Sequence, residues 1–118
     1  MTSSWLAALV ALASSGDFPA YGGARSLCSE RVYANTMEIH WRSWASVDPV
    51  EQVVAFYEKA RGEKPTRDHA GGWQWKDPTA PDHHFTIYRA DQAGIPSCRE
   101  KPTAKERTII LDSVAHRR

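Results

Sequence analysis

The sequence lacks most of the features that would identify a function directly. Of its 118 residues only two are cysteines, and 15 basic residues against 14 acidic ones leave a net charge of +1. No apolar run approaches the ~18 residues that a membrane-spanning helix needs. The balanced charge gives no general electrostatic reason to expect a nucleic-acid partner. The chain is therefore expected to form one domain, without a membrane span and without a nucleic-acid partner.

The sequence also lacks the common catalytic signatures. It contains no Gly-x-Ser-x-Gly elbow, no phosphate-binding loop and no HExxH zinc motif. Asp82, His83 and His84 are adjacent, but neighbouring side chains of a strand point to opposite faces, so the two histidines are not expected to share an ion. These absences favour a protein without catalytic activity.

The two cysteines, Cys28 and Cys98, are too far apart for a CxxC redox or zinc motif. In an exported protein they would form one disulfide between an early strand and a late loop, and the chain-entropy model gives such a bridge ~4 kcal/mol of stability. In a cytoplasmic protein they would be two separate thiols. Both interpretations stay open, and the choice depends on whether the chain is exported.

The N-terminal apolar segment, residues 5–13, also has two interpretations. Its length and the small residues Ala11 and Ala13 are typical of a signal peptide, although no Lys or Arg precedes it. Alternatively, the segment forms a helix that packs on the domain. We therefore divide the chain into an N-terminal segment and linker, residues 1–20, and one α+β domain, residues 21–118. Export to the periplasm or the cell exterior and a cytoplasmic location both remain open.

The clearest structural signal is an amphipathic helix over residues 48–61. Asp48 is predicted as its N-cap, with Pro49 at the first helical position and Glu51 three residues after the cap. Gly62 is predicted to end the helix in the left-handed conformation. The apolar stripe expected to face the core consists of Val50, Val53, Val54, Phe56, Tyr57 and Ala60.

Short apolar and β-branched runs on both sides of this helix predict strands. The expected strands cover residues 27–33, 37–42, 73–75, 85–88 and 108–111. Together with the helix they give the order (β)βαβββ. A single helix on one face of an antiparallel sheet of four to five strands buries the apolar stripe most simply, so the predicted class is α+β, with an extra N-terminal helix as an option.

The alternation of side chains along a strand predicts a candidate ligand surface. The residues of the first long strand expected to face the helix are Met37, Ile39 and Trp41. The opposite face is expected to carry an aromatic and basic surface. Its predicted members are His40, Arg42 and Trp44, together with Trp75 or Tyr88 from a neighbouring strand. Such a surface suits a small anionic or aromatic ligand, or a protein partner.

The order βαβββ is combined with a particular helix pattern. Asp48 is followed by Val53, by the pair Phe56-Tyr57 and by Gly62. This combination resembles the modules of the vicinal oxygen chelate superfamily, the glyoxalase and bleomycin-resistance group, over residues 37–114. Because catalytic members of that superfamily use two paired modules, the resemblance implies a homodimer for this single module.

The resemblance also implies a divalent-metal site. In that superfamily the first strand supplies a His or Gln and the last strand a Glu, and the matching positions here are His40 and Asp112. Asp112 is shorter than Glu, and His40 is about one residue out of register with Asp48, so the chain departs from the pattern at both ligands. A metal-dependent enzyme or sequestering protein is therefore the alternative hypothesis.

A second resemblance rests on residues 21–24, Tyr-Gly-Gly-Ala. Small exported α+β domains of unknown function carry a similar Tyr-Pro-Gly-Ala stretch after their export signal, and also a helix with an Asp-Pro start and a Phe-Tyr pair. Gly22 stands here where those domains have Pro. This second resemblance implies an exported protein of the same fold class.

Three functions follow from these observations. The first is a small non-catalytic binding or interaction module for a small ligand or a protein partner, with no cofactor assigned. The second is the metal-dependent homodimer of the vicinal-oxygen-chelate type, with His40 and Asp112 at the metal. The third is an immunity or inhibitor protein, with which the chain is consistent only in its size and its balanced charge.

Overall fold

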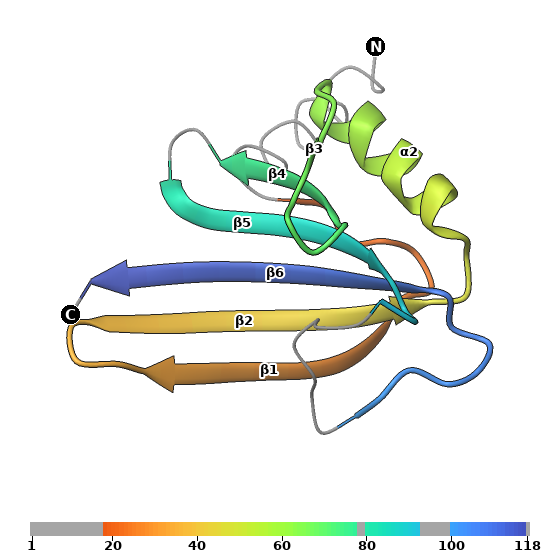
Figure 1. The fold of residues 1–118 in the computed structure, drawn as a ribbon. Coiled ribbons are helices and arrows are strands. Elements are labelled where there is room, and N and C mark those ends of the chain that lie inside the picture. The colour runs from red at the N-terminus through yellow and green to blue at the C-terminus, as the bar shows by residue number, and fades with distance from the viewer. Residues whose placement is uncertain (1–17, 78–79, 93–99, 118) are drawn as a thin grey trace, which may run out of the picture.

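A computed structural model describes residues 18–77, 80–92 and 100–117. Within these residues, six strands form one antiparallel sheet in the order β1-β2-β6-β5-β4-β3, and one helix packs against it (Figure 1). The elements are β1 (Arg25–Tyr33), β2 (Met37–Ser46), α2 (Val50–Arg61), β3 (Thr66–Arg67), β4 (Trp73–Asp77), β5 (Ala80–Arg89) and β6 (Thr108–Arg117). The predicted α+β class is confirmed, with six strands in place of four to five. The N-terminal segment 1–17 lies outside the described residues.

The start of α2 differs from the predicted capping arrangement. Pro49 is the N-cap, with φ −66° and ψ 154°, and no side chain caps the helix. The carboxylate of Asp48 instead accepts hydrogen bonds from the hydroxyl of Tyr21 at 2.6 Å and from the side-chain amide of Gln52 at 3.1 Å. The prediction of an Asp48 cap is wrong because these side-chain donors, not backbone N–H groups, engage its carboxylate.

The end of α2 agrees with the prediction. Gly62 adopts the left-handed conformation with φ 66°, and its N–H donates to the carbonyl of Glu58 at 2.8 Å. The apolar stripe is narrower than expected, because Phe56 is 39 % exposed and Ala60 is also exposed. No helix among the described residues is long and apolar enough to cross a membrane.

The strands extend beyond the apolar runs that predict them. The strand expected over residues 108–111 continues to Arg117, and the one expected over residues 37–42 continues to Ser46. The two strands pair without interruption from Met37 opposite Arg117 to Ser46 opposite Thr108. Because the backbone ladder satisfies the N–H and C=O groups of polar residues as well as apolar ones, hydrophobic patterning underestimates these lengths. The short β3 was not predicted.

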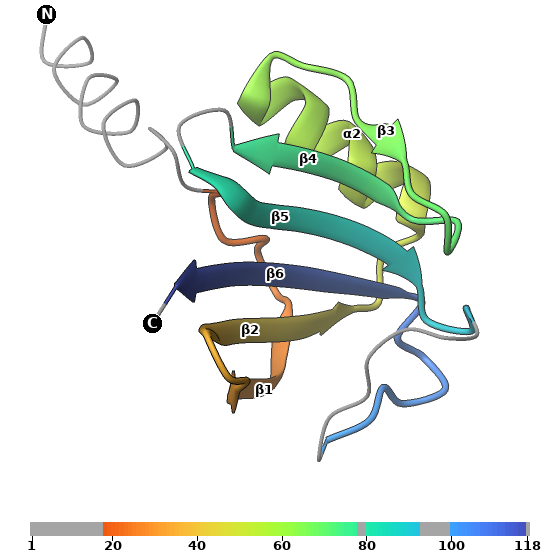
Figure 2. The same cartoon turned by 60° about the vertical axis from the view of Figure 1, so that its left-hand side comes forward.

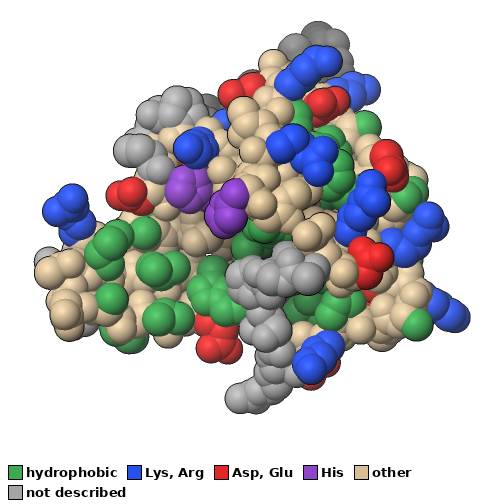
Figure 3. Space-filling model, in the orientation of Figure 1, with side chains coloured by type: hydrophobic (Ala, Val, Ile, Leu, Met, Phe, Trp, Pro, Cys, Tyr) green, Lys and Arg blue, Asp and Glu red, His purple; other side chains and the backbone are tan. Residues whose placement is uncertain are grey.

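The sheet carries an apolar cluster on each face. The cluster under α2 consists of Val50, Val53, Tyr57, Trp75, Phe85, Ile87 and Ile110. The cluster on the opposite face consists of Leu27, Ala45, Tyr88, Ile109 and Leu111. Hydrophobic side chains also gather over the free ends of β1, β2 and β6, at the left of the space-filling view (Figure 3). Val32 in β1 is 49 % exposed, so part of this apolar surface faces solvent.

The predicted orientation of β2 is reversed. Trp44 packs against the cluster under α2, whereas Trp41 packs against the cluster on the opposite face. Met37 and Ile39 share the face of Trp41 because side chains alternate. The expectation that these residues face the helix is therefore wrong. Alternation determines which residues share a face, but it does not determine which face the helix covers.

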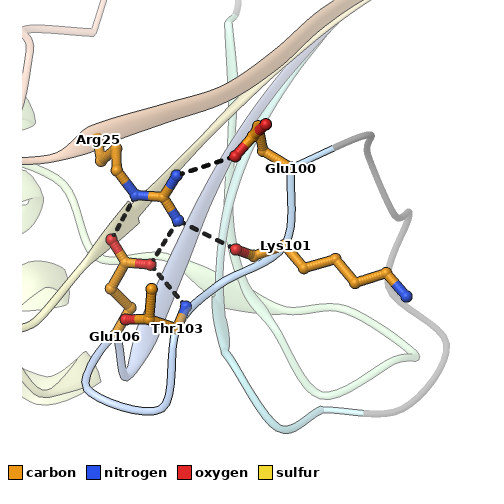
Figure 4. A network of polar contacts seen from close by, with 5 residues as sticks. All are labelled: Arg25, Glu100, Lys101, Thr103 and Glu106. Carbon is orange, nitrogen blue, oxygen red and sulfur yellow. Dashed lines mark hydrogen bonds and ion pairs between the residues drawn. The ribbon is translucent and has the colours of Figure 1, made fainter.

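A polar network fixes the start of β1 to the loop before β6 (Figure 4). Arg25 donates to both carboxylate oxygens of Glu106, at 2.9 and 2.8 Å, and to the carbonyl of Lys101 at 3.0 Å. The backbone N–H of Thr103 donates to Glu106 at 2.8 Å, and Glu100 lies 3.5 Å from Arg25. This bidentate pair is the strong form of an arginine–carboxylate contact, and it connects residues 81 positions apart.

The Glu106 network should make stability depend on acid pH. The hydrogen bonds from Arg25 and Thr103 lower the pKa of Glu106 from 4.5 to about 2. Because this pKa is lower in the folded state, the stabilisation is present above pH 4.5 and is lost as the pH falls towards 2. Glu106→Gln is expected to lower the urea midpoint at pH 6 and to flatten its decline between pH 4.5 and 2. Glu100→Gln, at the exposed end of the network, is the control. An unchanged acid slope in Glu106→Gln would contradict the assignment.

Candidate functional site

Residues 18–24, which we call the N-terminal strap, cross the sheet on the side of α2 (Figure 2). The ring of Phe18 stacks on the ring of Phe85 in β5, with centroids 4.0 Å apart and planes inclined by 2°. The hydroxyl of Tyr57 in α2 donates to the carbonyl of Pro19 at 2.7 Å. Tyr21 is held by its hydrogen bond to Asp48. The strap is therefore attached to both the sheet and the helix.

A cavity of about 220 Å³ lies beneath the strap. Its walls combine apolar and aromatic side chains with one acid and one base: Phe18, Pro19, Ala20, Tyr21, Ala24, Arg42, Trp44, Tyr57, Phe85, Ile110 and Asp112. Burial raises the pKa of Tyr57, and nearby Tyr21 and Asp112 raise it further. The Tyr57 phenol therefore remains a proton donor at neutral pH. The cavity is an aromatic site with a charged end.

Four charged or titratable side chains form a row that ends at this cavity. Nδ1 of His83 lies 3.5 Å from Oδ2 of Asp77, and Nε2 of His83 lies 2.5 Å from Oδ1 of Asp112. Nη2 of Arg42 lies 2.6 Å from Oδ2 of Asp112. The four residues come from the neighbouring strands β4, β5, β6 and β2, so the sheet order itself produces the row. We call it the acid–base row.

Three members of the acid–base row are buried and the fourth is not. Asp77, His83 and Asp112 are 4 %, 8 % and 7 % exposed, whereas the side chain of Arg42 is 49 % exposed. The rings of Phe18 and His83 form a T-shaped contact with centroids 5.6 Å apart, so Phe18 packs against the middle of the row. The open end of the row is therefore the Arg42 guanidinium.

Arg42 retains unused hydrogen-bonding capacity. A guanidinium has five N–H donors, and with the described residues Arg42 makes one hydrogen bond, to Asp112. The guanidinium carbon, Cζ, lies 5.4 Å from the ring centre of Trp44, which is a cation–π arrangement that helps to position the guanidinium. The site thus presents a positioned cation to the cavity.

The structure separates the residues predicted to form one ligand surface. Arg42 and Trp44 line the cavity. Trp75 is buried in the cluster under α2, where its N–H donates to the carbonyl of Glu63 at 2.9 Å. Tyr88 lies on the opposite face and donates to Asp68 at 2.8 Å; burial and this carboxylate raise the Tyr88 pKa to about 12.

His40, the remaining predicted member, lies on the side of Arg42 but not at the cavity. Its Nε2 is 3.0 Å from the Ser29 hydroxyl, and in the β2–β6 ladder His40 is opposite Val114. Asp112 is opposite Arg42 and has both oxygens engaged by Arg42 and His83. The register places His40 diagonally to Asp112 on the same face of neighbouring strands, so a metal site at this pair stays a prediction. Among the described residues, no group of three His, Cys, Asp or Glu side chains is arranged to hold a metal ion.

The adjacent histidines behave as expected from strand alternation. His83 enters the acid–base row on the side of α2, whereas His84 is opposite Lys76 and Ser113. Burial lowers the pKa of His84, and the nearby Lys76 lowers it further. The two rings therefore do not act on one ligand.

Asp77 and His83 are site residues that the sequence analysis missed. Asp77 has no role in the sequence analysis, and His83 is considered there only beside His84, as a possible metal ligand. One signal was available: His83 has the same parity as Phe85 and Ile87, and Asp112 has the same parity as Ile110. A polar side chain in phase with core residues predicts a buried polar partner.

Cys28 lies in β1 and takes part in a disulfide. Its predicted partner, Cys98, lies outside the described residues, so the pairing stays a prediction. The described part of the late loop is close to β1, because Glu100 contacts Arg25. A bridge from Cys28 to Cys98 fits this connection, since Cys98 is two residues before Glu100.

The acid–base row yields a stability prediction. Asp112→Asn removes the carboxylate that Arg42 and His83 share, and because Arg42 is half-exposed, water replaces part of the lost contact. We expect the free energy of unfolding to fall by about 1–3 kcal/mol, the cost of a disrupted buried hydrogen bond, measured by urea denaturation with tryptophan fluorescence. Asp82→Asn, an exposed acid beside His83, is the control and should stay within about 0.5 kcal/mol of the wild type. Equal effects of the two changes would show that the row contributes little.

The disulfide yields a second prediction. A non-reducing peptide map of protein purified without reductant is expected to join the Cys28 peptide to the Cys98 peptide. Cys28→Ser is expected to lose up to ~4 kcal/mol of unfolding free energy on the chain-entropy model, and reductant should no longer affect its stability. Two free thiols in the wild type, quantified by alkylation before reduction, would contradict the pairing.

Comparisons with known proteins identify no relative of this chain. No protein-family model, no curated protein and no solved structure matches the chain. The resemblances drawn from the helix pattern and from residues 21–24 therefore gain no support from these comparisons. The features that bear on function are the cavity, the strap and the acid–base row.

Proposed function

We propose that this protein is a small, non-catalytic binding module that holds a small molecule in the cavity beneath the N-terminal strap. The observation that carries the proposal is the combination of aromatic walls with a positioned cation, Arg42. Ligand sites are typically concave and mostly apolar, with a few polar groups that fix the orientation of the ligand. This cavity has that composition.

The hydrogen bonds around the cavity favour binding over catalysis. A general base must be free to take a proton from its substrate. Here His83 lies between two carboxylates, and the hydroxyls of Tyr57 and Tyr21 already donate to Pro19 and Asp48. These groups maintain the walls of the cavity, and Arg42 is the group with donors to offer. Cavity walls that are held by hydrogen bonds, together with an available donor on Arg42, suit ligand binding.

The size of the cavity limits the ligand to a small molecule. An engineered protein cavity of about 150 Å³ accepts a benzene ring. The 220 Å³ here exceeds that volume by less than half. A single ring or a short branched chain with one polar group matches this volume.

We also propose that the protein works in an oxidising compartment, as the export hypothesis requires. The disulfide at Cys28 supports this, because disulfides persist mainly in secreted and periplasmic proteins. The chain segment that would carry the export signal, residues 5–13, lies outside the described residues. A non-catalytic exported binding module is thus the combined proposal.

The proposal is tested by filling the cavity. Ala24 is half-buried in its wall, and Ala24→Phe places a ring in the space a ligand would occupy. A mixed panel of neutral, cationic and anionic one-ring fragments is screened by saturation-transfer NMR. We expect several fragments to bind the wild type and to lose at least about 1.4 kcal/mol of binding free energy, tenfold in affinity, in Ala24→Phe.

The matched control is Ala55→Phe, the same change at an exposed position of α2. It should leave fragment binding unchanged, and far-UV circular dichroism confirms that each variant is folded. Fragment binding that is equal in wild type and Ala24→Phe, or that is absent from the wild type, would rule out the cavity as the binding site.

A further inference from the structure

We infer that the ligand of the cavity is a small organic carboxylate: an anionic group that binds Arg42, attached to a flat apolar or aromatic body. This inference rests on the proposed function and specifies its ligand class. It depends on three observations, which are the order of charges in the acid–base row, the donors left on Arg42 and the composition of the cavity walls.

Acidic and basic side chains alternate along the acid–base row. It runs Asp77, His83, Asp112 and Arg42, with contacts of 3.5, 2.5 and 2.6 Å between successive members. At each step an acid lies next to a base. The last member is basic and half-exposed, and it ends at the cavity. The group that continues the alternation inside the cavity is an anion.

The geometry of Arg42 favours a carboxylate in particular. Its contact with Asp112 uses Nη2, so its other nitrogens remain available among the described residues. A guanidinium presents paired donors that match the two oxygens of a carboxylate. The guanidinium carbon also lies 5.4 Å from the ring centre of Trp44, a cation–π contact that favours its position at the cavity. A ligand carboxylate can bind these nitrogens while the contact with Asp112 is kept.

The acidic groups at and near the cavity already have hydrogen-bond donors bound to them. Both oxygens of Asp112 already accept hydrogen bonds, from His83 and from Arg42. The nearby Asp48 accepts from Tyr21 and Gln52. A cationic ligand would share these carboxylates with the donors already bound to them and would lie beside the Arg42 guanidinium, which repels it. An anionic ligand uses Arg42 donors that make no hydrogen bond to the other described residues. The arrangement therefore discriminates by charge.

The walls define the rest of the ligand. Phe18, Phe85 and Tyr57 form an aromatic group, with the Phe18 and Phe85 rings stacked and the Tyr57 and Phe85 ring centres 4.7 Å apart. Ile110 and Ala24 add aliphatic surface. A planar apolar body gains from contact with such rings. An aromatic or branched aliphatic acid of about ten non-hydrogen atoms suits a volume somewhat above that of a benzene cavity.

The test compares phenylacetate with its uncharged amide, phenylacetamide, which has nearly the same shape. Affinities are measured by titration calorimetry on the full chain with its disulfide intact. We expect phenylacetate to bind the wild type at least about tenfold more tightly than phenylacetamide. Arg42→Met should remove this difference, and Arg42→Lys should retain part of it because the charge remains. The matched control is Arg31→Met. Arg31 is an exposed arginine of β1 that pairs with Glu38 of β2, and its replacement should not change the difference in affinity between acid and amide.

Each other outcome overturns the inference and bears differently on the proposed function. Equal affinities for acid and amide, both lost in Ala24→Phe, would refute the anionic class while the cavity remains a binding site. Binding of panel fragments but of neither probe has the same meaning. Phenylacetate binding that persists in Ala24→Phe would place the anion elsewhere on the surface. No binding of any fragment to the wild type would refute both proposals.

Discussion

The pairing of β2 with β6 is the constraint on which the rest of the structure depends. It joins the N-terminal hairpin of β1 and β2 to the strands that follow the helix, over ten consecutive residue pairs. It also sets Arg42 directly opposite Asp112. A shift of one residue would turn every side chain of β2 to the other face. Trp44 would then leave the cluster under α2, and Arg42 would leave the cavity.

The same contacts that pack the domain also build the cavity. Tyr57 is buried in the core under α2 and at the same time anchors the strap through Pro19. Phe18 stacks on Phe85 and packs against His83 in the acid–base row. Asp48 fixes Tyr21 and thereby gives up its expected role as a helix cap. The strap is thus part of the core, and the cavity is the volume that the strap, the helix and the sheet leave between them.

The sequence is sufficient for local features and insufficient for those that join distant residues. The end of α2 at Gly62 follows from one residue type in one conformation. The Asp48 cap fails because its competitor, Tyr21, is 27 positions away. The acid–base row combines four strands, and no spacing in the sequence reveals which strands are neighbours. Parity within one strand places Arg42 and Trp44 on the same face, whereas the sheet order is needed to place Asp77 and His83 beside Asp112.

If the cavity holds a small carboxylate, as we propose, affinity and selectivity arise from different parts of the site. Arg42 already pairs with Asp112 and is half-exposed, so a second carboxylate gains a hydrogen-bonded contact but also displaces water from the guanidinium. The net gain from charge is therefore modest, and burial of the ligand body against Phe18, Phe85 and Ile110 supplies most of the affinity. Charge would instead act on selectivity, because a cation would be repelled by Arg42 and a neutral isostere would form a weaker hydrogen bond to it than a carboxylate does. Such a site is expected to bind a small acid moderately and its uncharged analogue more weakly.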